Sequence, residues 1–349
     1  MKRSTSQRAV RRIVSVLLIV LFSFCTLSVV GSVVAFRVIY RRTDNLNSVV
    51  TLRYSGIDSR RYPRQEVSFL SGKNRLHGYL YGAGNKGVIV IAPGVSSDSE
   101  AHLPEIMRFL DSGYTVLAYD MTGVCRSEGE SRVGLQQAKC DLLAAVDFVR
   151  QKNLPIYLYG HSLGAYAVAA ALDETEVTAA VCLSGFDSPV GMMHDSAKAH
   201  VGILADVEYP FLVFQNVLTF GADADDRAVE SINAVDTPVL ICHGTGDDVI
   251  PYEQGLNAQA DRLTNPNAVC ETVDAAFRSG HSYMWLSEDA ARYMAQKQEE
   301  LDDLKKACGG ELPQRVLDDF YRDFDAKKAA QTDGSFMDGV LRFYQEASS

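Results

Sequence analysis

Short apolar runs alternate with amphipathic stretches over most of the chain after residue 64. Several of these runs are apolar at consecutive positions, which is typical of strands that helices cover on both faces. The alternation indicates βαβ units and predicts an α/β fold with a mostly parallel sheet. The predicted strands are residues 76–81, 88–92, 115–119, 156–159, 178–183, 239–243 and 269–273. The predicted helices are residues 103–112, 134–152, 163–172, 257–263 and 335–347.

Two stretches interrupt this alternation. Residues 186–236 separate two predicted strands, exceed the length of an ordinary connection, and contain an apolar run from Tyr209 to Phe220. We expect this segment to form a cap. Residues 289–331 are rich in charge, and the apolar residues after Pro313 recur at helical spacing. We expect them to form a helical insertion, a hairpin that lies on the body of the protein.

An uncharged apolar run covers residues 13–36, between Arg12 and Arg37. Its 24 residues would reach roughly 36 Å as a helix, enough to cross a hydrocarbon core of about 30 Å. A cleaved signal peptide is the competing interpretation because the preceding tail is basic, but the apolar part of a signal peptide is shorter. We therefore expect a single-pass anchor that contacts the lipid bilayer through residues 13–36.

The charge of the chain is divided unevenly. Residues 1–42 contain eight Lys or Arg and no acidic residue, which leaves 26 basic and 44 acidic residues, a net charge of −18, for the remainder. An acidic body excludes a nucleic-acid binder. We expect a basic tail at 1–12, the anchor at 13–36, a juxtamembrane linker at 37–64 and one folded domain, the body, at 65–349. The basic tail favours a cytoplasmic N-terminus and a body outside the cytoplasm, at the cell membrane.

The sharpest motif is a G-x-S-x-G at residues 160–164, directly after a predicted strand and directly before an Ala-rich helix. Such a nucleophile elbow holds its serine in a strained turn, so Gly160 and Gly164 must lack side chains for strand and helix to approach. Ser162 is therefore the candidate nucleophile. A serine hydroxyl needs a base, and the base needs an orienting carboxylate.

The two partners are expected later in the chain, in the order acid then histidine. A Gly-rich turn with carboxylates follows the strand at 239–243, and we favour Asp247 there over Asp248, with Asp187 as a third candidate. His281 follows the last predicted strand and a glycine, where no packing role is evident. The sequence therefore predicts a Ser162–Asp247–His281 triad.

Acyl transfer also needs donors for the developing oxyanion, usually two backbone N–H groups. Leu163, the residue after the nucleophile, would supply one from the start of its helix. Val95, in the turn after the strand at 88–92, would supply the other, although an ordinary glycine turn would have the same sequence. His161 and His243 are expected to have structural roles. His194 and His200 lack metal-ligand partners at useful spacing, His77 and His102 give no signal, and no metal or organic cofactor is implied.

Together these residues resemble the α/β-hydrolase superfamily, especially its branch of serine aminopeptidase-like and monoacylglycerol-lipase-like enzymes. The resemblance rests on five stations in order, at residues 93–95, 120–129, 160–164, 244–251 and 280–281. It implies an eight-stranded, mostly parallel sheet with helices on both faces, a cap after the sixth strand, and the triad named above. The chain departs from the usual pattern at Pro93, where the family has His, and at Thr122 and Cys125 in the second station.

The function that follows is a membrane-anchored serine hydrolase that cleaves an ester, thioester or amide bond in a small-molecule or peptide acyl substrate. The apolar cap suggests an apolar acyl group, although apolar residues of a cap often pack only against one another. A peptidase would need an acidic clamp, for which Asp206, Glu208 and Asp223 are candidates. The alternative is a non-catalytic protein of the same fold that binds or scaffolds at the membrane.

Overall fold

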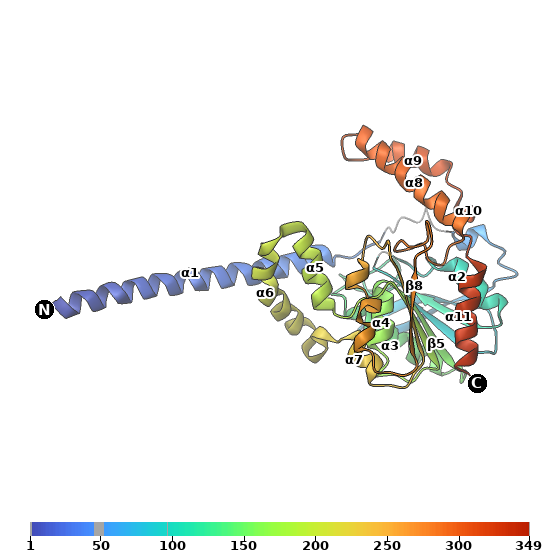
Figure 1. The fold of residues 1–349 in the computed structure, drawn as a ribbon, viewed down its shortest axis with the longest axis horizontal. Helices are drawn as coiled ribbons and strands as arrows, with labels where there is room; N and C mark the ends of the chain where they lie inside the picture. Colours follow the sequence, from blue (N-terminus) through green and yellow to red (C-terminus); the bar gives the residue numbers. More distant parts are fainter. Residues whose placement is uncertain (1, 45–51, 96, 349) are drawn as a thin grey trace.

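The computed structural model describes residues 2–44, 52–95 and 97–348. Part of the expected juxtamembrane linker, residues 45–51, and Ser96 of the expected oxyanion turn lie outside the described residues. A sheet at the centre of the molecule carries helices on both faces, and a long N-terminal helix extends away from it (Figure 1).

The sheet has eight strands in the order β1-β2-β4-β3-β5-β6-β7-β8. Strands β1 and β2 and strands β2 and β4 pair antiparallel, and all the other neighbours pair parallel. The predicted α/β-hydrolase fold class is thus confirmed. The strands are β1 (Arg64–Ser71), β2 (Asn74–Tyr81), β3 (Val88–Ala92), β4 (Thr115–Tyr119), β5 (Ile156–His161), β6 (Ala179–Leu183), β7 (Val239–Gly244) and β8 (Ala268–Val273).

Two apolar cores lie on opposite faces of the sheet. On strand β3, Val88 and Val90 belong to one core, and Ile89 and Ile91 belong to the other, because alternate side chains of a strand point to opposite faces. Helices α3 (Gln137–Arg150), α4 (Leu163–Ala170) and α7 (Ala228–Asn233) cover the first face. Helices α2 (Leu103–Asp111) and α11 (Gly334–Glu346) cover the second.

Helices between β6 and β7 form the cap, at the place where it was predicted. They are α5 (Pro189–Val201), α6 (Ile203–Phe220) and the 3₁₀-helix η2 (Gly221–Asp225), followed by α7. Helix α5 begins after Ser188, whose hydroxyl accepts a hydrogen bond from the Gly191 N–H. Gly202 separates α5 from α6 with a φ of 59°, a conformation that glycine adopts at little cost.

The N-terminal helix α1 (Lys2–Ile39) contains one candidate membrane span, Ala9–Ile39, with a mean hydropathy of 2.8 in its most apolar window. The segment after it packs on the body. The guanidinium of Arg42 donates hydrogen bonds to the backbone oxygens of Cys125, Ser127 and Gly129. The chain is therefore tied to the body within a few residues of the end of α1.

The insertion contains α8 (Glu288–Ala307), α9 (Gln314–Arg322) and α10 (Ala326–Ala329). The prediction that this hairpin lies on the body was wrong, because α8 and α9 project away from the sheet (Figure 1). The apolar stripe of α9 packs inside the hairpin instead. The Lys297 ammonium lies 5.2 Å from the ring centre of Phe320, and the rings of Tyr293 and Phe324 are 5.6 Å apart.

Two further elements differ from the prediction. Strand β1 was missed because it is an edge strand of largely polar, half-exposed residues. Residues 256–262 form a 3₁₀-helix, η4 (Leu256–Arg262), where an α-helix was expected. The segment lies between Gly255 and the Asn265–Pro266 pair, which leaves room for only a short helical stretch. Short 3₁₀-helices η1 (Tyr54–Gly56) and η3 (Tyr252–Gln254) complete the elements.

Candidate active site

A single residue, Ser162, separates strand β5 from helix α4. Its backbone has a φ of 57° and a ψ of −121°, a conformation that residues other than glycine rarely adopt. Its neighbours explain how this turn closes. A Cβ on Gly160 would lie 2.3 Å from the Gly164 oxygen, and a Cβ on Gly164 would lie 2.0 Å from the Ala92 oxygen. Both positions therefore require glycine, and the turn holds Ser162 at the carboxyl edge of the sheet.

Asp247 and His281 meet at the same edge, after β7 and β8. The Nδ1 atom of His281 lies 2.9 and 2.8 Å from the two carboxylate oxygens of Asp247, and both residues are buried. The backbone N–H of Ile250 also donates to this carboxylate, at 2.8 Å. His243 Nε2 lies 3.2 Å from Asp247 Oδ2 and 2.9 Å from the Ile250 oxygen.

The Asp247 carboxylate is held in its charged form. Burial raises its pKa, but hydrogen bonds from His243 and His281, together with the Ile250 N–H, outweigh burial and hold the pKa of Asp247 well below its ordinary value. A charged carboxylate on Nδ1 keeps the proton of the neutral imidazole on that nitrogen, which leaves Nε2 able to accept a proton.

His161 ties the histidine loop to the serine turn. Its Nε2–H donates to the backbone oxygen of His281 at 2.9 Å, and the centres of the two rings are 4.7 Å apart. The hydroxyl of Ser184 lies 3.4 Å from the same oxygen. Within the described residues no hydrogen bond joins Ser162 directly to His281. The structure thus closes the acid–histidine pair and, through His161, holds the histidine loop against the serine turn at the end of β5.

The turn after β3 lies against the elbow. A Cβ on Gly94 would lie 3.6 Å from the Cβ of Ser162, so the backbone at 93–95 borders the serine. Val95 and Leu163 both line a cavity of about 10 Å³, together with Tyr40 at the end of α1. The two residues expected to donate to an oxyanion therefore border one small space, although Ser162 itself does not line it.

Arg132 connects this turn to the N-terminal helix. Its guanidinium donates to the backbone oxygens of Val95 at 3.1 Å, Ile39 at 2.6 Å and Arg41 at 3.3 Å. Nothing in the sequence around Arg132, which lies in a loop between β4 and α3, indicated this contact. It brings together three segments that are distant along the chain.

A cleft of about 540 Å³ opens beside His281, between the body and the projecting hairpin. The body contributes residues after β7 and β8, and α8 contributes the facing wall. Acidic side chains predominate among the charged residues of the lining, which is formed by Asp248, Val249, His281, Ser282, Tyr283, Ala295, Gln298, Glu299, Asp302, Asp303 and Lys306. The insertion that the common fold does not explain thus borders the candidate base.

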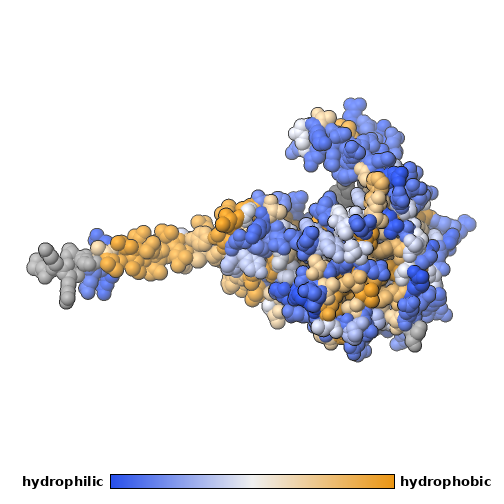
Figure 2. All heavy atoms as spheres, in the orientation of Figure 1, coloured by the Kyte–Doolittle hydropathy of each residue, from blue (hydrophilic) through white to orange (hydrophobic). Residues whose placement is uncertain are grey.

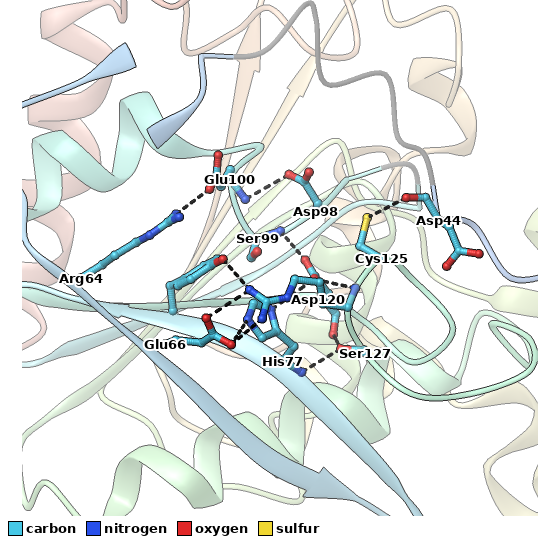
Figure 3. Close-up of polar contacts among 12 residues, drawn as sticks. Asp44, Arg64, Glu66, His77, Asp98, Ser99, Glu100, Asp120, Cys125 and Ser127 are labelled. Atoms are coloured by element: carbon cyan, nitrogen blue, oxygen red, sulfur yellow. Dashed lines mark hydrogen bonds and ion pairs between the residues drawn. The ribbon is translucent and has the colours of Figure 1, made fainter. Parts of the chain in front are cut away.

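The second station of the resemblance fixes the loop after β4. The Asp120 carboxylate accepts hydrogen bonds from the backbone N–H of Ser99 at 2.8 Å and of Arg126 at 3.2 Å (Figure 3). The Ser127 hydroxyl donates to the Asp120 backbone oxygen and accepts from the His77 N–H. These bonds connect the loop after β4 to strand β2 and to the segment after β3, so Asp120 and Ser127 fix that loop on the sheet.

The other candidates lie in different contacts. Asp187 accepts from the Val229 N–H at 2.9 Å and from Arg262 at 3.0 Å. Asp206 pairs with His194 and Lys198, and Glu208 accepts a hydrogen bond from Ser28 of α1. No group of three or more His, Cys, Asp or Glu that could hold a metal ion occurs in the part of the chain that the structure describes.

Comparisons with known proteins agree with the fold. The sequence profile of the serine aminopeptidase (S33) family matches residues 83–207, which include β3, the elbow and the start of the cap. An esterase of Pyrococcus furiosus has the same fold, with a TM-score of 0.54 over 77% of this chain and 98% of the esterase, at 18% identity. In its fold and in the matched segment, the chain is similar to the α/β-hydrolase superfamily.

Similar proteins of this superfamily include enzymes of several activities. A lysophosphatidylserine lipase of Danio rerio is 29% identical over 53% of this chain and 51% of the lipase. A polyketide transferase of a Penicillium species is 32% identical over 35% of this chain and 45% of the transferase. The chain thus spans about half the length of the curated relatives that it matches.

Proposed function

We propose that this protein is a membrane-anchored serine hydrolase that acts through an acyl-enzyme on Ser162. The observation that carries the proposal is the placement of a serine in a strained elbow at the same sheet edge as a buried, hydrogen-bonded Asp247–His281 pair. Relatives that are a lipase and an esterase support the same class of reaction.

In the proposed reaction, His281 Nε2 takes the proton of the Ser162 hydroxyl as the serine oxygen bonds to the substrate carbonyl carbon. The backbone N–H groups of Val95 and Leu163 would stabilise the oxyanion. Collapse of the tetrahedral intermediate breaks the bond to the leaving group, which receives the proton from His281. Water, deprotonated by the same imidazole, then releases the acid and restores Ser162. Asp247 holds the ring and stabilises its positive charge.

Among the possible bonds, an ester is the best supported. Asp206 and Glu208, two of the carboxylates that could clamp the amino terminus of a peptide, are bonded to other cap residues and to α1. We therefore expect hydrolysis of short p-nitrophenyl esters to exceed that of aminoacyl anilides. Comparable rates on the anilides would contradict the choice of an ester.

The anchor is part of the proposal. Helix α1 is long and apolar enough to cross a bilayer, and the tail that precedes its apolar run, residues 1–12, is basic. We propose that residues 13–36 remain in the mature protein, with the N-terminus in the cytoplasm and the body outside it.

A fluorophosphonate probe tests the nucleophile. The full-length protein in detergent should be labelled, and Ser162→Ala should abolish labelling because the probe phosphonylates an activated serine. Ser282→Ala, which removes an exposed serine beside His281, should be labelled like the wild type. A folded wild-type protein that is not labelled would instead support a non-catalytic protein that binds or scaffolds at the membrane.

A further inference from the structure

Helix α6 has an apolar face that no described residue covers. Its exposed apolar residues are Ile203, Leu204, Val207, Phe214, Val217 and Leu218. At 100° per residue they fall within one arc of about 140°. The opposite side is already used, because Ala205 and Asn216 are buried and Leu212 packs against the core. A cap helix in water would have a polar outer face, so the outer face of α6 requires an apolar environment.

Helix α1 lies directly beside this face. The rings of Phe24 and Phe211 pack edge to face with centres 5.8 Å apart, and the Ser28 hydroxyl donates to Glu208 at 3.0 Å. Between Phe24 and Tyr40 one stripe of α1 faces the cap and the body, whereas residues 9–23 are exposed on all sides. The apolar surface of α1 continues onto the neighbouring end of the cap (Figure 2).

The position along α1 at which α6 makes contact determines how deep α6 lies in the bilayer. Arg11 and Arg12 bound the apolar run at its N-terminal end, since charged side chains are costly in hydrocarbon. The freely exposed part that follows, residues 13–23, is about 17 Å long as a helix, which is shorter than a hydrocarbon core of about 30 Å. The rest of the membrane-spanning length must therefore be supplied by the part of α1 that contacts α6. Helix α6 therefore lies beside α1 at a level inside the hydrocarbon.

The two charged residues of α6 do not oppose this placement. The carboxylate of Asp206 accepts from His194 Nε2 at 2.9 Å and from Lys198 Nζ at 3.0 Å. Glu208 is half-buried and bonded to Ser28 within the contact between the two helices. Each carboxylate thus has a partner on the cap or on α1, which lowers the cost of approaching an apolar phase.

We propose that the outer face of α6 enters the membrane leaflet nearest the body, so that α1 and the cap form one docking surface in a lipid bilayer. Continuity with the proposed span, and not exposure alone, identifies lipid as the occupant. The placement puts the cap where acyl chains are dissolved, and the substrate class that follows is an acyl lipid taken from that leaflet. This second part rests on the proposed serine hydrolase, whereas the docking itself does not.

Fluorescence quenching by lipid tests the docking. The chain contains one tryptophan, the buried Trp285, so an added tryptophan reports its own surroundings. Full-length Leu204→Trp is reconstituted into phosphatidylcholine vesicles with and without bromine atoms on the acyl chains. We expect the brominated lipid to remove most of the added emission. Leu18→Trp in the free part of α1 should also be quenched.

Leu70→Trp is the matched control. Leu70 lies on strand β1 and is 58% exposed, close to the 61% of Leu204, and its added emission should be unaffected by bromine. Quenching of Leu18→Trp without quenching of Leu204→Trp would overturn the proposal, whether water or a second copy of the chain then covers α6. Failure to quench either position would also overturn it, because α1 would not be in the bilayer.

Activity separates the docking from the chemistry. The double variant Leu204→Glu with Leu218→Glu should lower kcat/KM for a vesicle-borne acyl ester by about tenfold or more, because charge on this face opposes entry into the leaflet. Hydrolysis of a soluble p-nitrophenyl ester should be unchanged. Equal rates of the variant and the wild type on the vesicle-borne ester would contradict substrate uptake from the leaflet. A wild type inactive on both esters would contradict the proposed hydrolase, and the quenching result would still stand.

Discussion

Asp247 and Asp248 are adjacent carboxylates in one turn, but the fold gives them different surroundings. Asp247 is buried against His281 and His243, whereas Asp248 is exposed at the wall of the cleft. The sequence pattern, in which an acidic residue follows a strand, indicates that a carboxylate lies in this turn but not which one it is. The curl of the backbone, which brings the Ile250 N–H to the carboxylate, decides which of the two meets the histidine.

Asp247→Asn should lower kcat for ester hydrolysis by about 10³–10⁴-fold, because the amide no longer holds His281 in the required tautomer. Asp248→Asn should change kcat by less than about threefold, because this side chain does not contact the imidazole. Steady-state kinetics on a soluble ester, with circular dichroism to verify folding, measure both. Equal losses in the two variants would contradict the assignment of the acid.

At the scale of elements, the elbow depends on two glycines between closely packed backbones. The same substitution, Gly to Ala, should change the free energy of unfolding in opposite directions at two places in the chain. A Cβ at Gly160 meets a backbone oxygen at 2.3 Å, whereas no atom lies within 4 Å of a Cβ at Gly339 in helix α11.

Gly160→Ala should therefore lower the free energy of unfolding by about 1–3 kcal/mol, since strand and helix must separate. Gly339→Ala should raise it by about 0.5–1 kcal/mol, since alanine has the higher helix propensity and reduces the freedom of the unfolded chain. Urea unfolding of the full chain in detergent measures both. A stabilised Gly160→Ala variant would show that the elbow is not closed as described.

Elements were predicted well where the strand or helix is buried on the sheet and poorly where it is not. Strands β3 and β4 were placed at their observed bounds because fully buried strands are continuously apolar. The edge strand β1 has no such run. The apolar stripe on α9 was recognised, but an apolar stripe does not specify the surface on which it packs. That surface proved to be α8 and not the sheet.

For the whole molecule, the buried His161 makes stability depend on pH. Burial, and then the neighbouring His281 and His102, lower the pKa of His161 well below its ordinary value. The folded protein therefore keeps His161 neutral, whereas the unfolded chain takes up a proton below a pH of about 6.5. The unfolded state then binds more protons, and stability falls as the pH drops below that value.

His161→Gln removes this contribution while it retains a hydrogen-bond donor. The destabilisation that the substitution causes at pH 7.5 should shrink by about 1.4 kcal/mol at pH 5.5, because the wild type alone loses the stability of a neutral histidine. Free energies of unfolding of both proteins at the two pH values give the difference. A destabilisation that is the same at both pH values would show that His161 is not kept neutral by the fold.

The sequence by itself determined the α/β-hydrolase fold, the apolar N-terminal segment and the candidate triad residues in their order, because each depends on local pattern or on order along the chain. Only the tertiary structure decided that Arg132 links the end of α1 to the turn at Val95, that the hairpin borders His281, and that α6 lies beside α1. These are contacts between surfaces far apart in the chain. An apolar face requires a partner, but its own residues do not specify which surface that partner will be.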